Sequence, residues 1–468
     1  MALKRFPVVK ERFALGQDCR KRMRRLDHKT WKAKDRWESP LKLLEASTQG
    51  RVPALVALKN ELMAASPFAY FRGAVPVMAY DLSLIANTGI RNQLCGDAHV
   101  RNLGAYAAQD GRLVFDINDF DETIVGPFEW DVKRMATSLI LAGRAAGAKN
   151  LHCREAAGVF LERYRIAMGT FARMPVLELA RYQVHRLQNV AAVEGILRMA
   201  ERATPMHTLM TLTEVKGGGP AVPMNRAKKK GVKAAGMKEP VGEMSQRVFK
   251  TMPPRLTRVK GEVAEQVLDS LTTYAESLQP ERRHFLAQYR PVDVAFKVVG
   301  TGSVGLRDYV VLMEGNGAKD PLFLQIKEEV ASGYAPYVSP GARKERQHQG
   351  RRVVEGERAM QLQSDPFLGW TTMGGRDYLV RQLNDHKASI QMENLKAVGL
   401  LEYAAVCGEM LARGHARAGD SAMIAGYVGR STRFDEAVGT FAEAYANQTE
   451  VDWKQLVQSL KKTAAKKG

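Results

Sequence analysis

The chain has 468 residues, of which 45% are hydrophobic and 26% are charged, a usage typical of a soluble globular protein with one large core or two ordinary ones. Its formal net charge is +20 at pH 7. Much of this charge lies in residues 1–36, with about 13 Lys and Arg against 4 Asp and Glu, and in residues 216–260, with about 12 against 2. We therefore expect basic arms and linkers with weak affinity for nucleic acid or an anionic surface.

Cysteine usage and hydropathy narrow the class of protein further. The four cysteines, Cys19, Cys95, Cys153 and Cys407, lie far apart without a C-x-x-C pair, so we expect neither a zinc site nor a disulfide framework. No run approaches the roughly 18 apolar residues of a membrane span, and the N-terminus lacks the apolar stretch of a secretory leader. We predict a cytoplasmic protein.

Residues 1–50 form a predicted basic arm, in which Trp31 and Trp37 are spaced as if one face docks on the rest of the protein. Residues 51–205 form a predicted helical lobe that carries the catalytic groups. Within this lobe, apolar residues recur at helical spacing from Pro53 to about Ala65, from 132 to 146, from 151 to 173 and from 176 to 202.

An acidic stretch interrupts these helices. Asp97 is followed five residues later by Asn102, and the apolar run 113–117 then leads to Asp119 and Asp121. Kinases use one carboxylate to accept a hydroxyl proton, an amide oxygen about five residues later for Mg²⁺, and a second carboxylate beyond a short hairpin for the same metal. We assign Asp97 as the base, Asn102 and Asp119 as metal ligands, and Asp121 as a secondary metal ligand. The alternative is a turn-rich loop whose polar side chains cap helices and turns.

Residues 206–261 are a predicted basic flexible linker, because they hold glycine, proline and lysine clusters with little periodicity. Residues 262–384 are a predicted β-rich lobe that binds a nucleotide. It opens with a predicted amphipathic helix from Glu262 to Leu278.

The β-rich lobe contains the pattern G-x-G-x-x-G at Gly300, Gly302 and Gly305, with Ser303 inside it. Glycines in such a turn let backbone N–H groups approach phosphate oxygens. Predicted strands precede and follow the turn, and a third strand carries Lys327. This order is that of protein kinases, whereas a dinucleotide-binding fold places a helix directly after the glycines. We assign the glycine turn and Lys327 to nucleotide binding and reject the dinucleotide fold.

A charged helix is predicted over residues 343–363. In kinases, a carboxylate on such a helix pairs with the strand lysine and fixes it on the phosphates. Glu357 lies on the apolar face of the helix and is the predicted partner of Lys327, with Glu355 as the reserve. The alternative is a solvated helix with charge pairs one turn apart.

Residues 385–468 are predicted to complete the helical lobe and to end in a basic tail. The strand 378–383 and the four residues after it, Asn384 to Lys387, would connect the lobes and offer their backbone to an adenine. A long helix is predicted from about Glu393 to Ala416.

Several motifs resemble those of known families. Gly96-Asp-Ala-His-Val-Arg-Asn102, Asn118-Asp-Phe-Asp-Glu122 and Trp130-Asp131 resemble the catalytic loop, metal-binding segment and following Asp of the aminoglycoside-phosphotransferase branch of kinase-like proteins. Nearly the whole chain is similar to the bacterial domain-of-unknown-function 2252 family, through motifs that include Ser66-Pro-Phe68, Phe71-Arg-Gly73, Cys95-Gly-Asp-Ala-His99, Gly302-Ser-Val-Gly305, Leu324-Gln-Ile-Lys-Glu328, Phe367-Leu-Gly-Trp370 and His415-Ala-Arg417. The second resemblance implies a shared fold and no particular activity.

The kinase-like parts occur in an unusual order. Ordinary kinases run from the glycine hairpin and lysine strand to the catalytic loop and metal-binding Asp, whereas here the last two come first. Circular permutation is tolerated because packing depends on spatial neighbours and chain termini lie at the surface. We predict an α+β, protein-kinase-like two-lobe fold that is circularly permuted.

These assignments predict an ATP- and Mg²⁺-dependent phosphotransferase that acts on a hydroxyl of a small molecule or a protein. Asp97, Asn102, Asp119 and Lys327 are its expected catalytic residues.

Three alternatives stay open. The chain could be a catalytically silent kinase-like scaffold that binds RNA or a protein partner through its basic arms, or it could transfer AMP instead of phosphate. It could also be a metal-dependent phosphoesterase that uses Asp97, His99, Asp119 and Asp121, which would leave Lys327 and the glycine hairpin without a role.

Overall fold

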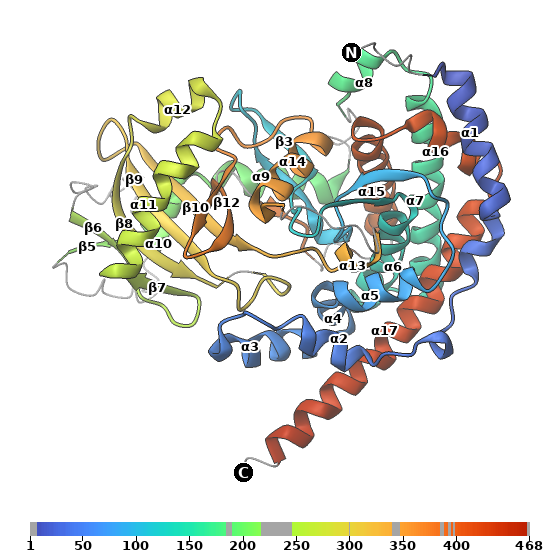
Figure 1. The fold of residues 1–468 in the computed structure, drawn as a ribbon, viewed down its shortest axis with the longest axis horizontal. Coiled ribbons are helices and arrows are strands. Elements are labelled where there is room, and N and C mark those ends of the chain that lie inside the picture. The colour runs from blue at the N-terminus through green and yellow to red at the C-terminus, as the bar shows by residue number, and fades with distance from the viewer. Residues whose placement is uncertain are drawn as a thin grey trace, which may run out of the picture.

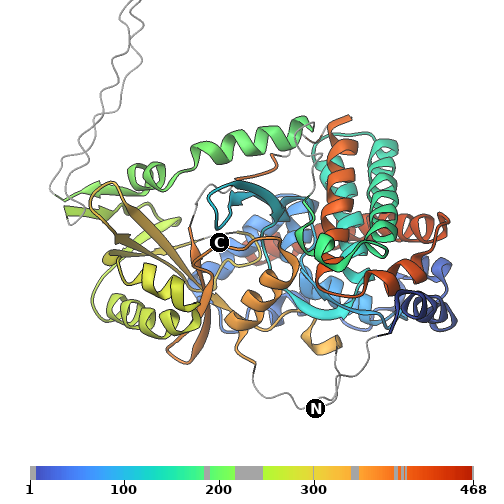
Figure 2. The same cartoon turned by 90° about the horizontal axis from the view of Figure 1, so that it is seen from above.

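The computed structural model is an α+β protein in which a β-rich part and a helical part lie side by side (Figure 1). It describes residues 7–183, 190–216, 246–298, 300–338, 347–383, 388–391, 395 and 398–465. The predicted α+β class is confirmed. Seen from above, the strands of the main sheet lie at one end of the molecule and the long helices at the other (Figure 2).

Six antiparallel strands form the main sheet, in the order β11-β12-β10-β9-β8-β7. Their bounds are β7 Leu256–Val259, β8 Arg290–Lys297, β9 Asp308–Glu314, β10 Pro321–Glu329, β11 Gly369–Met373 and β12 Arg376–Gln382. The expected hairpin and the strand that carries Lys327 are confirmed as local structure, because β8, β9 and β10 are consecutive antiparallel neighbours. Lys327 lies opposite Asp308 of β9 and Leu379 of β12.

The two faces of the main sheet pack differently, because successive residues of a strand point to opposite faces. On one face, Ile326 of β10 lies in a core with α11 (Glu262–Ser277). On the other face, Phe323 lies in a core with α10 (Pro205–Leu212). Lys327 lies four residues after Phe323 on β10, so both side chains are on the same face of the sheet. This face is the one opposite the α11 core.

Two small sheets carry the acidic stretch, which lies between the main sheet and the long helices (Figure 1). β1 (Arg91–Leu94) pairs with β4 (Ile124–Pro127), and β2 (Leu103–Ala107) pairs with β3 (Leu113–Ile117). β13 (Ala388–Ser389) adds to the free edge of β2.

The helical part is built around α6, α7, α15 and α17, which share one buried apolar core; α6 and α7 each contact the other three helices. Its helices and the remaining ones are α2 Pro40–Ala46, α3 Pro53–Ala64, α4 Pro67–Gly73, α5 Val75–Ser83, α6 Glu129–Ala145, α7 Asn150–Phe171, α8 Val176–Arg181, α9 Ala191–Arg202, α12 Pro280–Leu286, α13 Ala335–Val338, α14 Gln349–Met360, α15 Val398–Arg417, α16 Ser421–Val428 and α17 Arg433–Ala465, with 3₁₀ turns at Arg25–Lys29, Ala33–Asp35 and Val100–Asn102. None of the helices in the described ranges combines the length and the apolar character needed to cross a bilayer.

The predicted basic arm is packed against the helical part wherever it is described. Its helix α1 (Val9–Arg22) lies along α16, and Trp31 is only 6% exposed whereas Trp37 is 79% exposed. One of the two predicted docking tryptophans is therefore part of the core.

Basic residues of this arm make ion pairs inside the protein. Arg36 binds Asp81 at 2.6 Å and Asp452 at 2.9 Å, and Arg12 binds Asp420 at 2.8 Å. These cations hold the arm on the helices and are engaged before any external partner arrives.

The range 206–261, expected to be an irregular linker, contains regular structure at both described ends. Helix α10 covers part of the main sheet, and β5 (Thr213–Val215) pairs with β6 (Arg247–Phe249). Residues 217–245 lie outside the described residues, and so does the predicted connector 384–387.

Candidate active site

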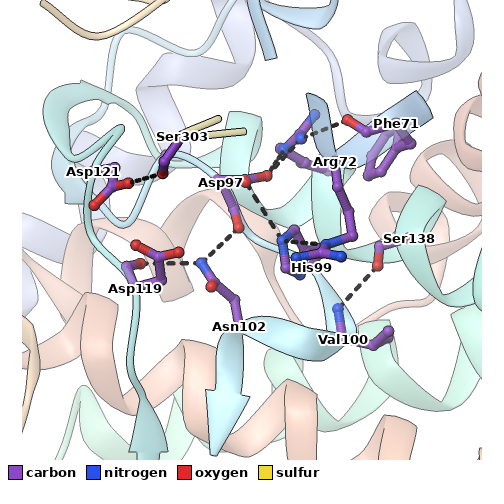
Figure 3. Close-up of polar contacts among 12 residues, drawn as sticks. Phe71, Arg72, Asp97, His99, Val100, Asn102, Asp119, Asp121, Ser138 and Ser303 are labelled. Carbon is purple, nitrogen blue, oxygen red and sulfur yellow. Dashed lines mark hydrogen bonds and ion pairs between the residues drawn. The ribbon is translucent and has the colours of Figure 1, made fainter. Parts of the chain in front are cut away.

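The β2–β3 hairpin brings Asn102 and Asp119 together. Asn102 directly precedes β2 and Asp119 follows β3, and the N–H of Asn118 donates to the Asn102 carbonyl at 2.9 Å. Asn102 is 2% exposed, and its Nδ2 donates to the carbonyl oxygens of Asp97 at 2.8 Å and Asp119 at 3.0 Å (Figure 3). Because the amide nitrogen is bound to the backbone, the amide oxygen is the atom that remains for a ligand.

The loop that carries Asp97 is anchored by Asp131 in the first turn of α6. The two carboxylate oxygens of Asp131 accept from the N–H groups of Cys95 at 2.8 Å and Gly96 at 3.0 Å. Gly96 has a φ of 85°, and a Cβ there would lie 2.1 Å from the Glu122 carbonyl oxygen. Only glycine therefore lets this loop pack so closely on the segment that ends at Glu122.

Asp97 keeps its negative charge because of two neighbours. Arg134 of α6 donates to Oδ1 from Nε at 2.8 Å and from a terminal nitrogen at 2.5 Å. His99 Nε2 lies 3.4 Å from Oδ2 (Figure 3). Burial acts to raise the pKa of Asp97, but Arg134 and His99 outweigh it and hold the pKa well below its usual range. The Asp97 side chain is 17% exposed, so a ligand hydroxyl can still reach it.

Lys327 meets the acidic stretch although it lies 206 residues beyond Asp121. Its ammonium forms an ion pair with Asp121 Oδ2, and the Ser303 hydroxyl of the glycine turn donates to the same oxygen at 2.9 Å. Burial acts to lower the pKa of Lys327, but Asp121 and Asp119 raise it above its ordinary value. The lysine is therefore a fixed cation at neutral pH.

Asp119 and Asp121 have the properties of a partly formed cation site. Oδ1 of each is buried and has no hydrogen-bond partner within the part of the chain that the structure describes. Burial and the charge of Asp121 raise the pKa of Asp119 to about 6. In the described ranges, no three His, Cys, Asp or Glu side chains are grouped to hold a metal by themselves. These residues fit Mg²⁺, which binds one or two carboxylates and takes its other ligands from phosphates and water.

The raised pKa of Asp119 leads to an expected pH dependence. A divalent ion must displace the Asp119 proton, so Mg²⁺ affinity should fall by up to about tenfold for each pH unit below about pH 6. Without metal, the free energy of unfolding should change with pH in the opposite direction to the Mg²⁺ affinity. A carboxyl whose pKa is raised in the folded state stabilises the protein at low pH, and this contribution is lost as the pH rises through about 6. Thermal unfolding with and without Mg²⁺ across this range measures both effects. Asp119→Asn should abolish both, and an unchanged pH profile in that variant would contradict the assignment.

A cavity of about 610 Å³ lies between the glycine turn and the acidic stretch. The predicted site residues Asn102, Gly305, Lys327 and Glu357 are not among the residues that line it. The walls include the predicted residues Asp97, Asp119, Asp121, Gly300, Gly302 and Ser303, together with His99.

The glycine turn has a conformation that its sequence requires. Gly300 and Gly305 have φ values of 61° and 92°, in the left-handed region that favours glycine. The turn is also held from outside the sheet, because the Gly305 carbonyl accepts from the N–H of Val52 at 2.7 Å and the Val304 carbonyl accepts from Arg51 at 2.6 Å. Gly305 thus serves the shape of the turn and its attachment to the N-terminal helices.

Glu357 and Glu355 occupy different environments on α14. Glu357 is 4% exposed. It acts on Arg381 of β12: burial alone would lower the pKa of this arginine, but nearby carboxylates, Glu357 first among them, raise it. Glu355 pairs with Arg351 at 2.7 Å on the exposed side of the helix. Lys327 forms its ion pair with Asp121. Among the described residues, no ion pair joins Lys327 to Glu357 or Glu355.

Two arginines of the site were not assigned from the sequence. Arg352 of α14 donates to the carbonyl oxygens of Asp121 at 2.8 Å, Thr123 at 2.5 Å and Val330 at 2.9 Å. It thereby joins the acidic stretch to the end of β10. Arg134 of α6 is the other. For both arginines the sequence does contain a signal of burial, namely a charged residue at an apolar position of an amphipathic helix.

Comparison with known proteins identifies a family. No curated protein and no solved structure matches the chain. A family model described as "Uncharacterized protein conserved in bacteria (DUF2252)" matches residues 51–459. This range contains the acidic stretch, the main sheet and all of the candidate site residues. The chain therefore belongs to the DUF2252 family.

Proposed function

We propose that this protein is an ATP- and Mg²⁺-dependent phosphotransferase that acts on a hydroxyl group. The observation that carries the proposal is the contact of Lys327 and Ser303 with Asp121, beside Asp119 and Asn102. A strand lysine, a glycine turn and a pair of oxygen-bearing side chains suited to a metal, brought together in this way, are the parts that phosphoryl transfer requires.

We further infer that the fold is a circularly permuted protein-kinase-like fold. Three features support this: the glycine turn lies between β8 and β9, Lys327 follows on the next strand, and α14 packs against β10 and β12. The acidic stretch precedes all of them in the chain and yet lies against them in space. A cut before the catalytic loop of an ordinary kinase would produce this order.

The side chains would share the work as follows. Lys327 contacts the nucleotide phosphates in the bound state, and the backbone of the glycine turn covers them. Asn102 and Asp119 hold Mg²⁺, which neutralises phosphate charge. Asp121, paired with Lys327 in the absence of ligand, is the second carboxylate available to the metal.

Asp97 is better suited to orient an acceptor hydroxyl through a hydrogen bond than to act as a general base that removes its proton. Its pKa is held well below the usual range, so it is a weak base at neutral pH. Phosphoryl transfer through a loose transition state needs little deprotonation in advance, so a carboxylate that accepts the hydroxyl hydrogen bond and aligns the oxygen is sufficient.

The test is incubation of the full chain with a bacterial metabolite extract, Mg²⁺ and either γ-labelled or α-labelled ATP, followed by mass analysis of products and protein. Label transfer from γ-labelled ATP alone is the expected result. Transfer from α-labelled ATP would assign AMP transfer instead. Absence of any transfer, together with absence of nucleotide binding in a thermal-shift assay, would favour the silent scaffold.

The phosphoesterase alternative is weaker on structural grounds. It needs a cluster of acidic and histidine ligands that can hold metal ions alone, and none was found among the described residues. His99 is also turned toward Asp97 and Arg72, at 3.4 Å from each (Figure 3).

A further inference from the structure

The cavity has a cationic wall that the phosphotransferase parts do not use. Arg51, which follows α2, Lys59 of α3 and Arg72 of α4 all line it. Among the described residues, no carboxylate lies within ion-pair distance of any of these three side chains. The acidic stretch lines the same cavity and has its own cation in Lys327.

Lys59 is the most deeply buried of these three cationic side chains. It is 2% exposed, and burial together with the nearby charge of Arg51 lowers its pKa to about 7. Glu122 is the acid that acts on it most, but that carboxylate accepts the N–H of Gly333 at 2.7 Å. A buried ammonium without a counter-charge costs several kcal/mol, so this position favours an anionic ligand.

The two arginines extend the cationic wall along the cavity. Arg51 donates to the carbonyl oxygens of Ser47 at 3.1 Å and Val304 at 2.6 Å, which fixes its guanidinium beside the glycine turn. Arg72 lies beside the catalytic loop, with its Nε 3.4 Å from His99 Nε2 (Figure 3). Cationic groups and Asp97 thus line the same cavity.

We propose that the acceptor is an alcohol that also carries a phosphate, sulfate or carboxylate group, and that Lys59, Arg51 and Arg72 bind this group while the hydroxyl lies at Asp97. The transfer step rests on the proposed function; the anion site does not. In that step the acceptor oxygen forms a bond to the γ-phosphorus, the bond from that phosphorus to the β–γ bridging oxygen breaks, and the hydroxyl proton leaves to solvent through Asp97. The products are ADP and the phosphorylated acceptor.

Nucleotide phosphates are the other possible source of the anion. The acceptor is favoured because Lys327 and the glycine turn already serve the nucleotide, and because Lys59 belongs to the wall formed by the N-terminal helices. The two sources differ in one measurable respect: an acceptor site stays open when nucleotide is bound, whereas a nucleotide-phosphate site is filled.

The experiment is calorimetric titration of the full chain with inorganic phosphate, with and without saturating Mg²⁺ and a non-hydrolysable ATP analogue. Phosphate should bind in both conditions, and Lys59→Met should weaken it by about 10- to 100-fold. Lys59→Arg should largely retain binding. The matched control is Lys42→Met, since Lys42 is an exposed lysine of α2 whose side chain is 73% exposed and which pairs with Glu38. This control should leave the affinity unchanged.

Removing Lys59 gives a second readout that does not depend on a ligand. Because an unpaired buried charge is lost, Lys59→Met should unfold at an equal or higher temperature than the parent chain. Unchanged phosphate affinity in a folded Lys59→Met variant would overturn the proposal, and so would exclusion of phosphate by the nucleotide analogue. If the analogue does not bind at all while phosphate still binds through Lys59, the phosphotransferase proposal fails and the anion site stands.

Discussion

Asp97→Asn is expected to reduce phosphoryl transfer by about 100- to 10,000-fold while leaving Mg²⁺–nucleotide binding close to that of the parent protein. The side chain contacts Arg134 and His99, whereas its main-chain carbonyl anchors Asn102. Asparagine keeps that carbonyl and one oxygen for Arg134 but loses the charge that orients a hydroxyl. The measurement is single-turnover transfer from γ-labelled ATP beside nucleotide-dependent thermal stabilisation.

A matched control for Asp97 is available in the main sheet. Asp293 of β8 is a buried carboxylate that binds Arg258 at 2.9 Å and accepts from the N–H of Phe249, but it does not line the cavity. Asp293→Asn should reduce stability and leave turnover per folded molecule unchanged. Full turnover in folded Asp97→Asn would end the assignment of this residue.

Lys327→Met is expected to remove most of the transfer activity and to destabilise the protein by about 3–5 kcal/mol at neutral pH. Lys327 is 3% exposed, and its loss leaves Asp121 and Asp119 buried without their cation. Their folded-state pKa values would then rise above the unfolded values, so the protein would be more stable below about pH 4 and lose that stability as the pH increases. Urea denaturation at several pH values measures this change.

Removing both partners separates the lysine's stabilising role from its role in transfer. Lys327→Met combined with Asp121→Asn eliminates the unpaired charge, so the double variant should regain much of the lost stability. It should not regain transfer, because the contact with phosphate is still missing. Normal kinetics in Lys327→Met would refute the role of the lysine.

The local elements around the glycine turn could be predicted because their sequence signals are local. The apolar alternation of β8 and β9 and the glycines between them define a hairpin without reference to the rest of the chain. The same holds for the β2–β3 hairpin, which explains why Asn102 and Asp119 meet. Asp97 and Asp119 both line the cavity.

The charged partners could not be predicted, because they come from elements distant in the chain. Arg134 reaches Asp97 across 37 residues, and Arg352 reaches Asp121 across 231. Lys59 lies in a helix whose sequence alone is equally compatible with a solvated lysine. The sequence predicts the partner of Lys327 on the helix over residues 343–363, whereas the acid that pairs with it, Asp121, comes from the segment after β3.

The two bonds that Val52 and Arg51 make to the glycine turn constrain how the molecule can move. Admission of a nucleotide to such a cleft usually involves a rotation of one domain against the other. Here the turn is tied to the beginning of α3, so the rotation must either break both bonds or carry α3 along with the sheet. In the second case Lys59 moves with the glycine turn, so that opening of the proposed nucleotide cleft and reshaping of the proposed anion site become a single motion.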